Sequence, residues 1–164
     1  MQFTTPNQTV AADIMVPRKK LVVLRPDMDA LAAIRLLVKK QISGAPVVDE
    51  GGHYLGVFSE KTSMRFLLRL SYDSLPSNEV SSFMNTEPDR TIDEATSVLS
   101  IMELFLRTPY RRLPVVTDGV LVGQISRRDV LTSVTQSLQN DDKQRYQRET
   151  LYLSATDAVN ARFA

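Results

Sequence analysis

Hydrophobic residues in this chain alternate between short extended runs and stretches with helical spacing. The run Leu21–Leu24 is continuous, as is typical of a buried strand. It is followed by Leu31, Ile34 and Val38, which are three or four residues apart and would share one face of an amphipathic helix. A strand followed by a helix is therefore predicted for the first forty residues.

The next segment has the pattern of a β-hairpin followed by a second helix. Pro46–Val48 and Leu55–Phe58 are apolar runs on either side of a turn that contains Gly51 and Gly52. A helix is then expected from near Glu60, with apolar positions at Met64, Leu67 and Leu68. The order strand, helix, strand, turn, strand, helix follows.

The same order recurs in the second half of the chain. Thr91–Glu94 has the form of a helix N-cap with an acid three positions on, and a strongly amphipathic stretch follows it. Three landmark pairs lie 69, 68 and 67 residues apart: Met15 and Met84, Pro46 and Pro114, and Gly56 and Gly123. The chain is therefore predicted to be an internal duplication.

The predicted fold is α+β, with two pseudo-symmetric β-α-β-β-α repeats packed through their sheets. We place the first repeat at 8–70, a linker at 71–79, and the second repeat at 80–136. Residues 137–164 form a polar C-terminal extension that could be helical or a frayed tail. One repeat alone would expose the apolar face of a small sheet, whereas two repeats can cover each other.

Composition restricts the possible functions. The 164 residues carry 20 basic and 19 acidic side chains, so net charge gives no reason to expect nucleic acid or an anionic membrane as partner. There are no cysteines, which excludes thiolate catalysis and Cys-ligated metals. No metal site and no catalytic residue are predicted. No signal sequence or membrane-spanning stretch is evident, so a cytoplasmic location is expected.

The ordered set of motifs resembles a cystathionine β-synthase (CBS) domain, and it occurs twice. Ile42–Asp49 and Gly56–Ser59 carry the resemblance in the first repeat, and Ser126–Asp129 matches the Ser/Thr-x-x-Asp signature of the family in the second. The resemblance implies a tandem pair, or Bateman module, with two clefts. Such clefts commonly hold AMP, ADP, ATP or S-adenosylmethionine, and the modules often form homodimers.

One cleft has all the parts that an adenine nucleotide needs. By resemblance, the Asp129 carboxylate and Ser126 would bind the ribose hydroxyls. Arg111 and Arg112, aided by Arg128 at a helix N-terminus, would meet the phosphate. The adenine slot, carried over by position, comprises Pro17, Val22, Ile42, Ser43 and Gly44.

The second cleft departs from the family pattern. Thr62 stands where the signature has Asp, and a hydroxyl cannot supply the two strong acceptors of a carboxylate. Its remaining candidates are Ser59, Thr86 and Tyr110, with Arg111 beside the adenine position. We expect this second site to be weaker or empty.

Each candidate also has a purely structural interpretation. Ser126 and Asp129 could form only a helix capping box, and Arg111 and Arg112 could be a solvated pair that offsets a helix dipole. Gly44 could be a plain turn residue. His53, the sole histidine, lies in a hairpin turn and is expected to be a solvated loop residue rather than a catalytic base.

The sequence thus predicts a regulatory adenine-nucleotide sensor that is not an enzyme and needs no cofactor. Because no effector domain is evident, output would pass in trans to an unknown effector protein. Two alternatives stay open: a ligand-independent dimerisation scaffold, and a binder of S-adenosylmethionine or a similar adenosyl compound. Arg111 and Arg112 distinguish the nucleotide sensor from these alternatives, since only a ligand with phosphate should need both arginines.

Overall fold

The computed structural model describes residues 9–72, 78–87, 90–139 and 143, and its mixture of helices and strands agrees with the predicted α+β class. The first half contains α1 (Ala11–Ile14), β1 (Val16–Pro17), η1 (Arg18–Lys20), α2 (Ala30–Lys40), β2 (Gly44–Val48), β3 (Tyr54–Ser59) and α3 (Glu60–Tyr72). The second half contains η2 (Val80–Ser82), α4 (Val98–Arg107), β4 (Arg112–Thr117), β5 (Val120–Ser126) and a final helix at 127–139. The rest of the predicted extension, apart from residue 143, and residues 73–77 of the predicted linker lie outside the described residues.

The two hairpins, β2–β3 and β4–β5, are copies of each other down to their irregularities. Both are antiparallel, and the register shifts between Val47 and Val48 in one and between Val115 and Val116 in the other. Each also accepts a parallel bridge at the same place, from Leu24 to Val47 and from Ile92 to Val115. The predicted duplication is thus present in the backbone.

The segment that opens each repeat pairs with the sheet of the other repeat. β1 lies antiparallel to β5, with Val16 opposite Gln124, while Asn85 exchanges two backbone hydrogen bonds with Val57 of β3, at 2.8 and 2.9 Å. The first apolar core contains residues of both repeats, since Phe83 of the second repeat packs edge-on against Phe66 of the first. The repeats are therefore interlocked, an arrangement that the repeat pattern alone did not predict.

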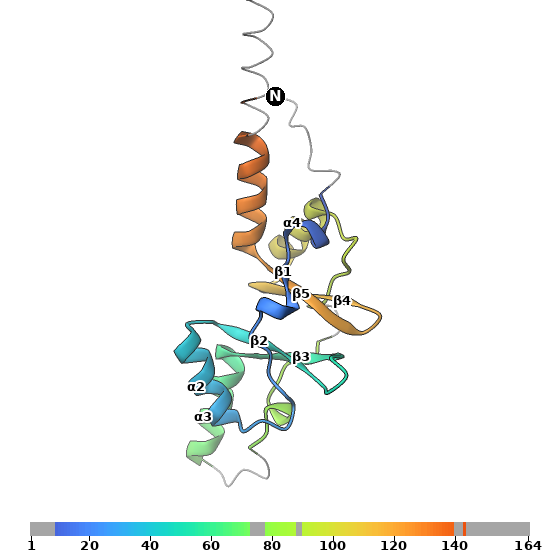
Figure 1. Cartoon of the computed structure of the whole chain (residues 1–164). Coiled ribbons are helices and arrows are strands. Elements are labelled where there is room, and N and C mark those ends of the chain that lie inside the picture. The colour runs from blue at the N-terminus through green and yellow to red at the C-terminus, as the bar shows by residue number, and fades with distance from the viewer. Residues whose placement is uncertain (1–8, 73–77, 88–89, 140–142, 144–164) are drawn as a thin grey trace, which may run out of the picture.

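The two sheets meet in the middle of the molecule, and the helices cover their outer sides (Figure 1). α2 and α3 lie on one side, and α4 and the final helix lie on the other. The hairpin turns also touch, since Tyr54 N–H donates to the Gly119 carbonyl at 2.9 Å and Leu121 N–H donates to the Gly52 carbonyl at 3.1 Å. The seam between the repeats is thus closed by backbone hydrogen bonds.

The start of α4 differs from the prediction. The Thr91–Glu94 segment is not a helix N-cap, because Ile92 bonds to β4 through Pro114 O at 3.0 Å and Val116 N at 2.9 Å. The helix instead begins after Ser97, whose hydroxyl oxygen accepts from Ser100 N–H. Pairing with a neighbouring strand thus prevails over a local capping pattern.

Close approach of the exchanged segments requires glycine at Gly56. A Cβ built there would lie 2.5 Å from the Asn85 carbonyl oxygen, which is itself fixed by its bonds to Val57. The glycine is therefore needed for space.

We predict that Gly56→Ala destabilises the protein by about 1–3 kcal/mol, because the exchanged backbone must move away from β3. Urea denaturation followed by circular dichroism measures this. Gly51→Ala is the matched control, since its Cβ would meet only side-chain atoms of His53 and Asp49 at the hairpin turn, and its effect should stay within about 0.5 kcal/mol. Equal stability of the two variants would contradict the exchange.

Candidate functional site

Equivalent capping boxes begin the second helix of each repeat. In the second repeat, Asp129 Oδ2 accepts from Ser126 N–H at 2.7 Å and from the Ser126 hydroxyl at 2.6 Å. In the first repeat, Thr62 Oγ1 accepts from Ser59 N–H at 2.8 Å and donates to the Ser59 carbonyl at 2.9 Å. The structural interpretation of Ser126 and Asp129 as a capping pair is thus realised, and it does not preclude ligand binding.

The two capping boxes differ in whether a side-chain oxygen stays available to a ligand. Thr62 is 3% exposed, and its hydroxyl both accepts and donates within the box. Asp129 is half-buried and uses Oδ2 alone, so Oδ1 has no hydrogen bond within the described part of the chain. One carboxylate oxygen of Asp129 is therefore left for a donor.

A cavity of about 570 Å³ lies between the repeats, walled by α3, by β3 and by the chain that leads into β4. Seven of the predicted residues line it: Ser43, Gly44, Ser59, Thr62, Tyr110, Arg111 and Arg112. The other seven do not: Pro17, Val22, Ile42, Thr86, Ser126, Arg128 and Asp129. The cavity therefore combines two of the three predicted phosphate-binding arginines with most of the predicted second cleft.

Arg112 joins the cavity to the Ser126–Asp129 cap. It is half-buried, lines the cavity and stands directly opposite Ser126 in the β4–β5 register. Gly44 occupies the equivalent place opposite Ser59. Arg112 and Ser126 thus occupy paired positions on adjacent strands, and Asp129 lies in the first turn of the helix that follows Ser126.

Arg111 and Arg128 are exposed, in contrast to Arg112. Arg111 approaches Glu60 of α3 at 4.0 Å, an ion pair that spans the two repeats and in which both side chains are largely in solvent. Exposed pairs of this kind contribute little stability, at most about 1 kcal/mol. An anion of higher charge can therefore replace Glu60 on Arg111.

Further cavity residues were missed by the sequence analysis. The Arg90 guanidinium lies 4.8 Å from the centre of the Tyr110 ring, and the Tyr110 hydroxyl donates to Glu87 at 2.8 Å. That hydrogen bond lowers the pKa of Glu87. Arg90 lies between η2 and α4 in a segment without a local motif, so no sequence signal marked it.

Two buried polar atoms near this cluster have no hydrogen-bond partner among the described residues: Arg90 Nε and the Tyr54 hydroxyl. Burial raises the pKa of Tyr54 to about 12, against the opposing effect of the Arg90 charge. The Tyr54 hydroxyl is therefore neutral at physiological pH. The positive charge of Arg90 lies at the cavity wall with the exposed Glu87 carboxylate, whose pKa it also lowers.

The five residues predicted to form the adenine slot lie in different parts of the structure. Pro17 is held in β1 opposite Gly123. Val22 and Ile42 are half-buried against the first core. Ser43 and Gly44 reach the cavity, and a Cβ at Gly44 would come within 3.0 Å of the Phe58 carbonyl oxygen.

Within the described residues, no helix is of the length and hydrophobicity that crossing a membrane requires. Those residues also contain no grouping of three or more potential metal ligands among His, Cys, Asp and Glu.

Comparison with known proteins decides the family. The CBS domain matches residues 10–66 and again residues 80–135. The chain belongs to the CBS domain family. Its two CBS domains form the tandem pair that the sequence predicted.

Known CBS-pair proteins share the fold. The chloroplastic CBS domain-containing protein CBSX2 of Arabidopsis thaliana is 28% identical over 154 residues, which cover 76% of this chain and 63% of that protein. The chain thus spans less than two thirds of this relative. A crystal structure of CBSX2 in complex with AMP superposes with a TM-score of 0.69 at 31% identity, covering 77% of this chain and 96% of that one. CbpB in complex with c-di-AMP has a TM-score of 0.73 at 20% identity, covering 84% and 92%.

The hydrogen bond from Ser126 N–H to the Asp129 carboxylate is expected to stabilise this CBS pair. Asp129→Ala should lower the free energy of unfolding by about 1 kcal/mol, because Ser126 N–H loses its acceptor. Asp129→Asn keeps an acceptor oxygen and should cost less than half as much. Urea denaturation followed by tyrosine fluorescence compares them, and an Ala variant as stable as the parent would show that the cap contributes nothing.

Proposed function

We propose that this CBS pair is a regulatory module that binds an adenine nucleotide, AMP, ADP or ATP, between its repeats and has no catalytic activity of its own. The observation that carries the proposal is the placement of Arg111 and Arg112 in the cavity lining, with Arg112 opposite Ser126, so that a ligand held by Arg112 would extend from the cavity toward the Ser126–Asp129 cap, which lies outside the cavity lining. A cationic wall beside a carboxylate matches a ligand that has phosphate at one end and ribose hydroxyls next to it.

The ribose is assigned to Asp129 rather than to Thr62. Asp129 Oδ1 is available to accept from the ribose hydroxyls while Oδ2 maintains the cap. The Thr62 hydroxyl is buried and already both donates and accepts. Occupying Thr62 would break its cap, so the second site is proposed to be the weaker one.

The phosphate is assigned to Arg112 and Arg111, with Arg128 as a further cation at the start of the final helix. Arg112 is held beside the cap by the β4–β5 register, and Arg111 would exchange Glu60 for phosphate. Guanidinium groups suit this role because they donate two parallel hydrogen bonds to phosphate oxygens. S-adenosylmethionine has no phosphate and carries a positively charged sulfonium next to its ribose, so it matches these arginines less well than a nucleotide does.

The adenine is assigned to the slot of Pro17, Val22, Ile42, Ser43 and Gly44. β1 brings Pro17 onto the sheet of the second repeat, whereas Ser43 and Gly44 come from the first repeat. The ligand would thus contact both repeats. The AMP complex of CBSX2, at 31% identity, supports an adenine nucleotide as the ligand class.

Nucleotide binding would act on partners through the arrangement of the repeats. A ligand that contacts both repeats favours the arrangement in which both sets of contacts form, and it shifts the population by its differential affinity. The signal would pass in trans, either to a second copy of this chain or to an effector protein.

Self-association is proposed at the helices of the second repeat. Leu106 of α4 and Leu131 of the final helix are 87% and 66% exposed. Charges nearby are already engaged, since Arg107 pairs with Glu103 and Arg127 donates to the Phe105 carbonyl. A nearly neutral apolar face of this kind can pack against its own copy without like-charge repulsion.

Isothermal titration calorimetry with AMP, ADP, ATP and S-adenosylmethionine tests the ligand. We expect at least one nucleotide to bind, and Arg112→Ala to weaken it by about 10- to 100-fold through loss of a charge-assisted hydrogen bond. Arg107→Ala is the matched control, because Arg107 lies on α4 outside the cavity lining. Tighter binding of S-adenosylmethionine, unaffected by Arg112→Ala, would overturn the phosphate assignment.

The ribose assignment has its own test. Asp129→Asn should weaken the nucleotide by about tenfold or more while the cap persists, whereas Thr62→Val should leave affinity nearly unchanged. The reverse ranking in the same titrations would place the nucleotide in the other cleft.

The oligomeric state tests the self-association proposal. The parent protein is expected to be a homodimer by size-exclusion chromatography with light scattering, and a variant carrying Leu106→Asp and Leu131→Asp should be a monomer, because two buried carboxylates would lack partners. Circular dichroism confirms that the variant is folded. An unchanged dimer mass would rule out this face.

A further inference from the structure

The cavity between the repeats carries more cationic than acidic side chains. Two acids line it, and both have partners: Glu60 approaches Arg111 at 4.0 Å, and Glu87 accepts from the Tyr110 hydroxyl at 2.8 Å. The cationic lining residues are Lys61, Arg65, Arg90, Arg111 and Arg112, an excess of three positive charges over the two acids of the described lining. The phosphate of a nucleoside monophosphate, with a charge of about −2, would leave part of this excess unmatched.

The three cations that the nucleotide assignment has not used come from both repeats. Lys61 and Arg65 are four residues apart on α3 of the first repeat, so they share one face of that helix, and both are exposed. Arg90 belongs to the second repeat and precedes α4. An anion in the cavity can therefore meet cations from both sides of the seam.

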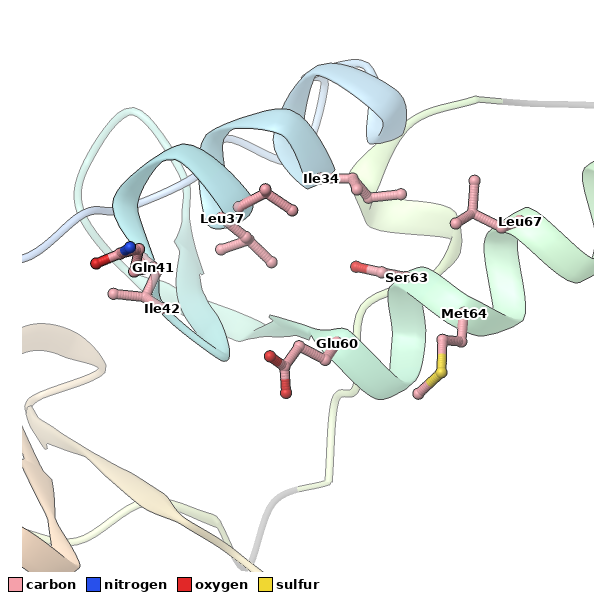
Figure 2. A pocket seen from close by; sticks show the side chains of 9 residues that line it. Ile34, Leu37, Gln41, Ile42, Glu60, Ser63, Met64 and Leu67 are labelled. Atoms are coloured by element: carbon pink, nitrogen blue, oxygen red, sulfur yellow. The ribbon is translucent and has the colours of Figure 1, made fainter.

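Another cavity, of about 620 Å³ between α2 and α3, shows the contrast (Figure 2). Its described walls are mainly apolar, and the one charged side chain among them is the acidic Glu60. That cavity has no cation for an anion to meet. The excess of positive charge is thus a property of the cavity between the repeats.

The strand register shows which position Arg90 occupies. Leu24 bridges to Val47 in the first repeat, and Ile92 bridges to Val115 at the same place in the second. Two residues before these bridges lie Val22 and Arg90. The second repeat thus has a guanidinium where the first has an apolar side chain that the sequence assigns to the adenine slot.

Tyr110 marks a second such difference. Pro46 and Pro114 hold equivalent places in the two hairpins, and Ile42 and Tyr110 lie four residues before them. The Arg90 guanidinium lies over the Tyr110 ring, 4.8 Å from its centre. An adenine base cannot stack on this face of the ring while the guanidinium covers it. The two apolar positions of the first slot have therefore become a cation held on an aromatic ring.

Arg90 also has a donor in need of an acceptor. Its Nε atom is buried and has no hydrogen-bond partner among the described residues, although the side chain lines the cavity. Buried donors are rarely left unpaired in folded proteins, so one at a cavity wall indicates that a ligand supplies the acceptor. Phosphate oxygens fit a guanidinium best, because they accept two parallel hydrogen bonds from it.

We propose that Arg90, Lys61 and Arg65 bind an oligophosphate chain of two or more linked phosphates, and that this part of the cavity does not hold a second adenine base. The chain is assigned to the β- and γ-phosphates of ATP whose α-phosphate meets Arg112, an assignment that rests on the proposed function. Free inorganic oligophosphate has the same chemistry. Arg90 is then a specificity-determining residue that favours ATP over AMP.

Titrations with phosphates of different length test the proposal. Isothermal titration calorimetry without magnesium uses AMP, ATP, inorganic phosphate, inorganic tripolyphosphate and adenosine. ATP should bind about tenfold or more tightly than AMP, and tripolyphosphate more tightly than phosphate, because only the longer chains reach all three cations. Both affinities should fall with added salt.

Variants assign the effect to these cations. Arg90→Gln should weaken ATP and tripolyphosphate by about tenfold or more and change AMP affinity by no more than about twofold. The combination Lys61→Gln and Arg65→Gln should act in the same direction, and its exposed helix positions keep the test valid if Arg90→Gln proves unstable by circular dichroism. Arg69→Gln is the matched control, because Arg69 lies on α3 outside the cavity lining and should change neither affinity.

Asp129→Asn separates this proposal from the proposed function. It should weaken ATP and AMP alike and leave tripolyphosphate unchanged. Tripolyphosphate binding that depends on Arg90, without binding of any nucleotide, would support the oligophosphate site with a free oligophosphate as ligand and would contradict the proposed function. Nucleotide binding with equal affinities for AMP and ATP would overturn the oligophosphate site alone.

Three further results would overturn the oligophosphate site: no binding of any phosphate compound, unchanged ATP and tripolyphosphate affinity in Arg90→Gln, or the same loss of affinity in Arg69→Gln. Adenosine binding that Arg90→Gln abolishes would also contradict it, because a base would then contact the guanidinium.

Discussion

Backbone pairing between the two repeats is the constraint on which the rest of this structure depends. Neither hairpin is completed by its own repeat: β5 is extended by β1, and β3 is bridged by Asn85. The exchange requires the chains to approach closely, and Gly56 leaves the space for it. Because each core then contains segments from both repeats, neither half can form its complete core without the other. A stable seam between the repeats is the result, and seven of the fourteen predicted ligand-binding residues line the cavity there.

The pseudo-twofold relation places equivalent groups on both sides of the seam, and small substitutions then make the two sides different. Asp129 has one carboxylate oxygen outside the cap, whereas the hydroxyl of Thr62, at the equivalent position, both donates and accepts within its cap. Arg112 stands opposite Ser126 where Gly44 stands opposite Ser59. The outer faces differ as well: α2 and α3 carry six basic residues and one acidic residue, whereas α4 and the final helix carry three basic and two acidic residues. A duplicated fold has thus acquired one strong candidate ligand position and two distinct outer surfaces.

The sequence was sufficient for the parts of the structure that depend on local pattern. The repeated hairpins follow from apolar runs around glycine turns, and the Ser126–Asp129 pair was recognisable from its spacing. Features set by pairing between distant segments were not predictable in this way. Ile92 joins β4 although its neighbours look like a helix start, and β1 crosses to the other sheet. Arg90 reaches the cavity from the segment between η2 and α4, and only tertiary structure shows that it lies over Tyr110.

The central claim is that one nucleotide spans the seam, with its ribose on Asp129 and its phosphate on Arg112. A crystal structure of the complex with AMP tests this most directly. The account predicts ribose hydroxyls within hydrogen-bond distance of Asp129 Oδ1, which is about 2.5–3.0 Å for a hydroxyl donor, and phosphate oxygens within similar reach of the Arg112 guanidinium. AMP bound in contact with one repeat alone, or with its ribose on Thr62, would contradict it.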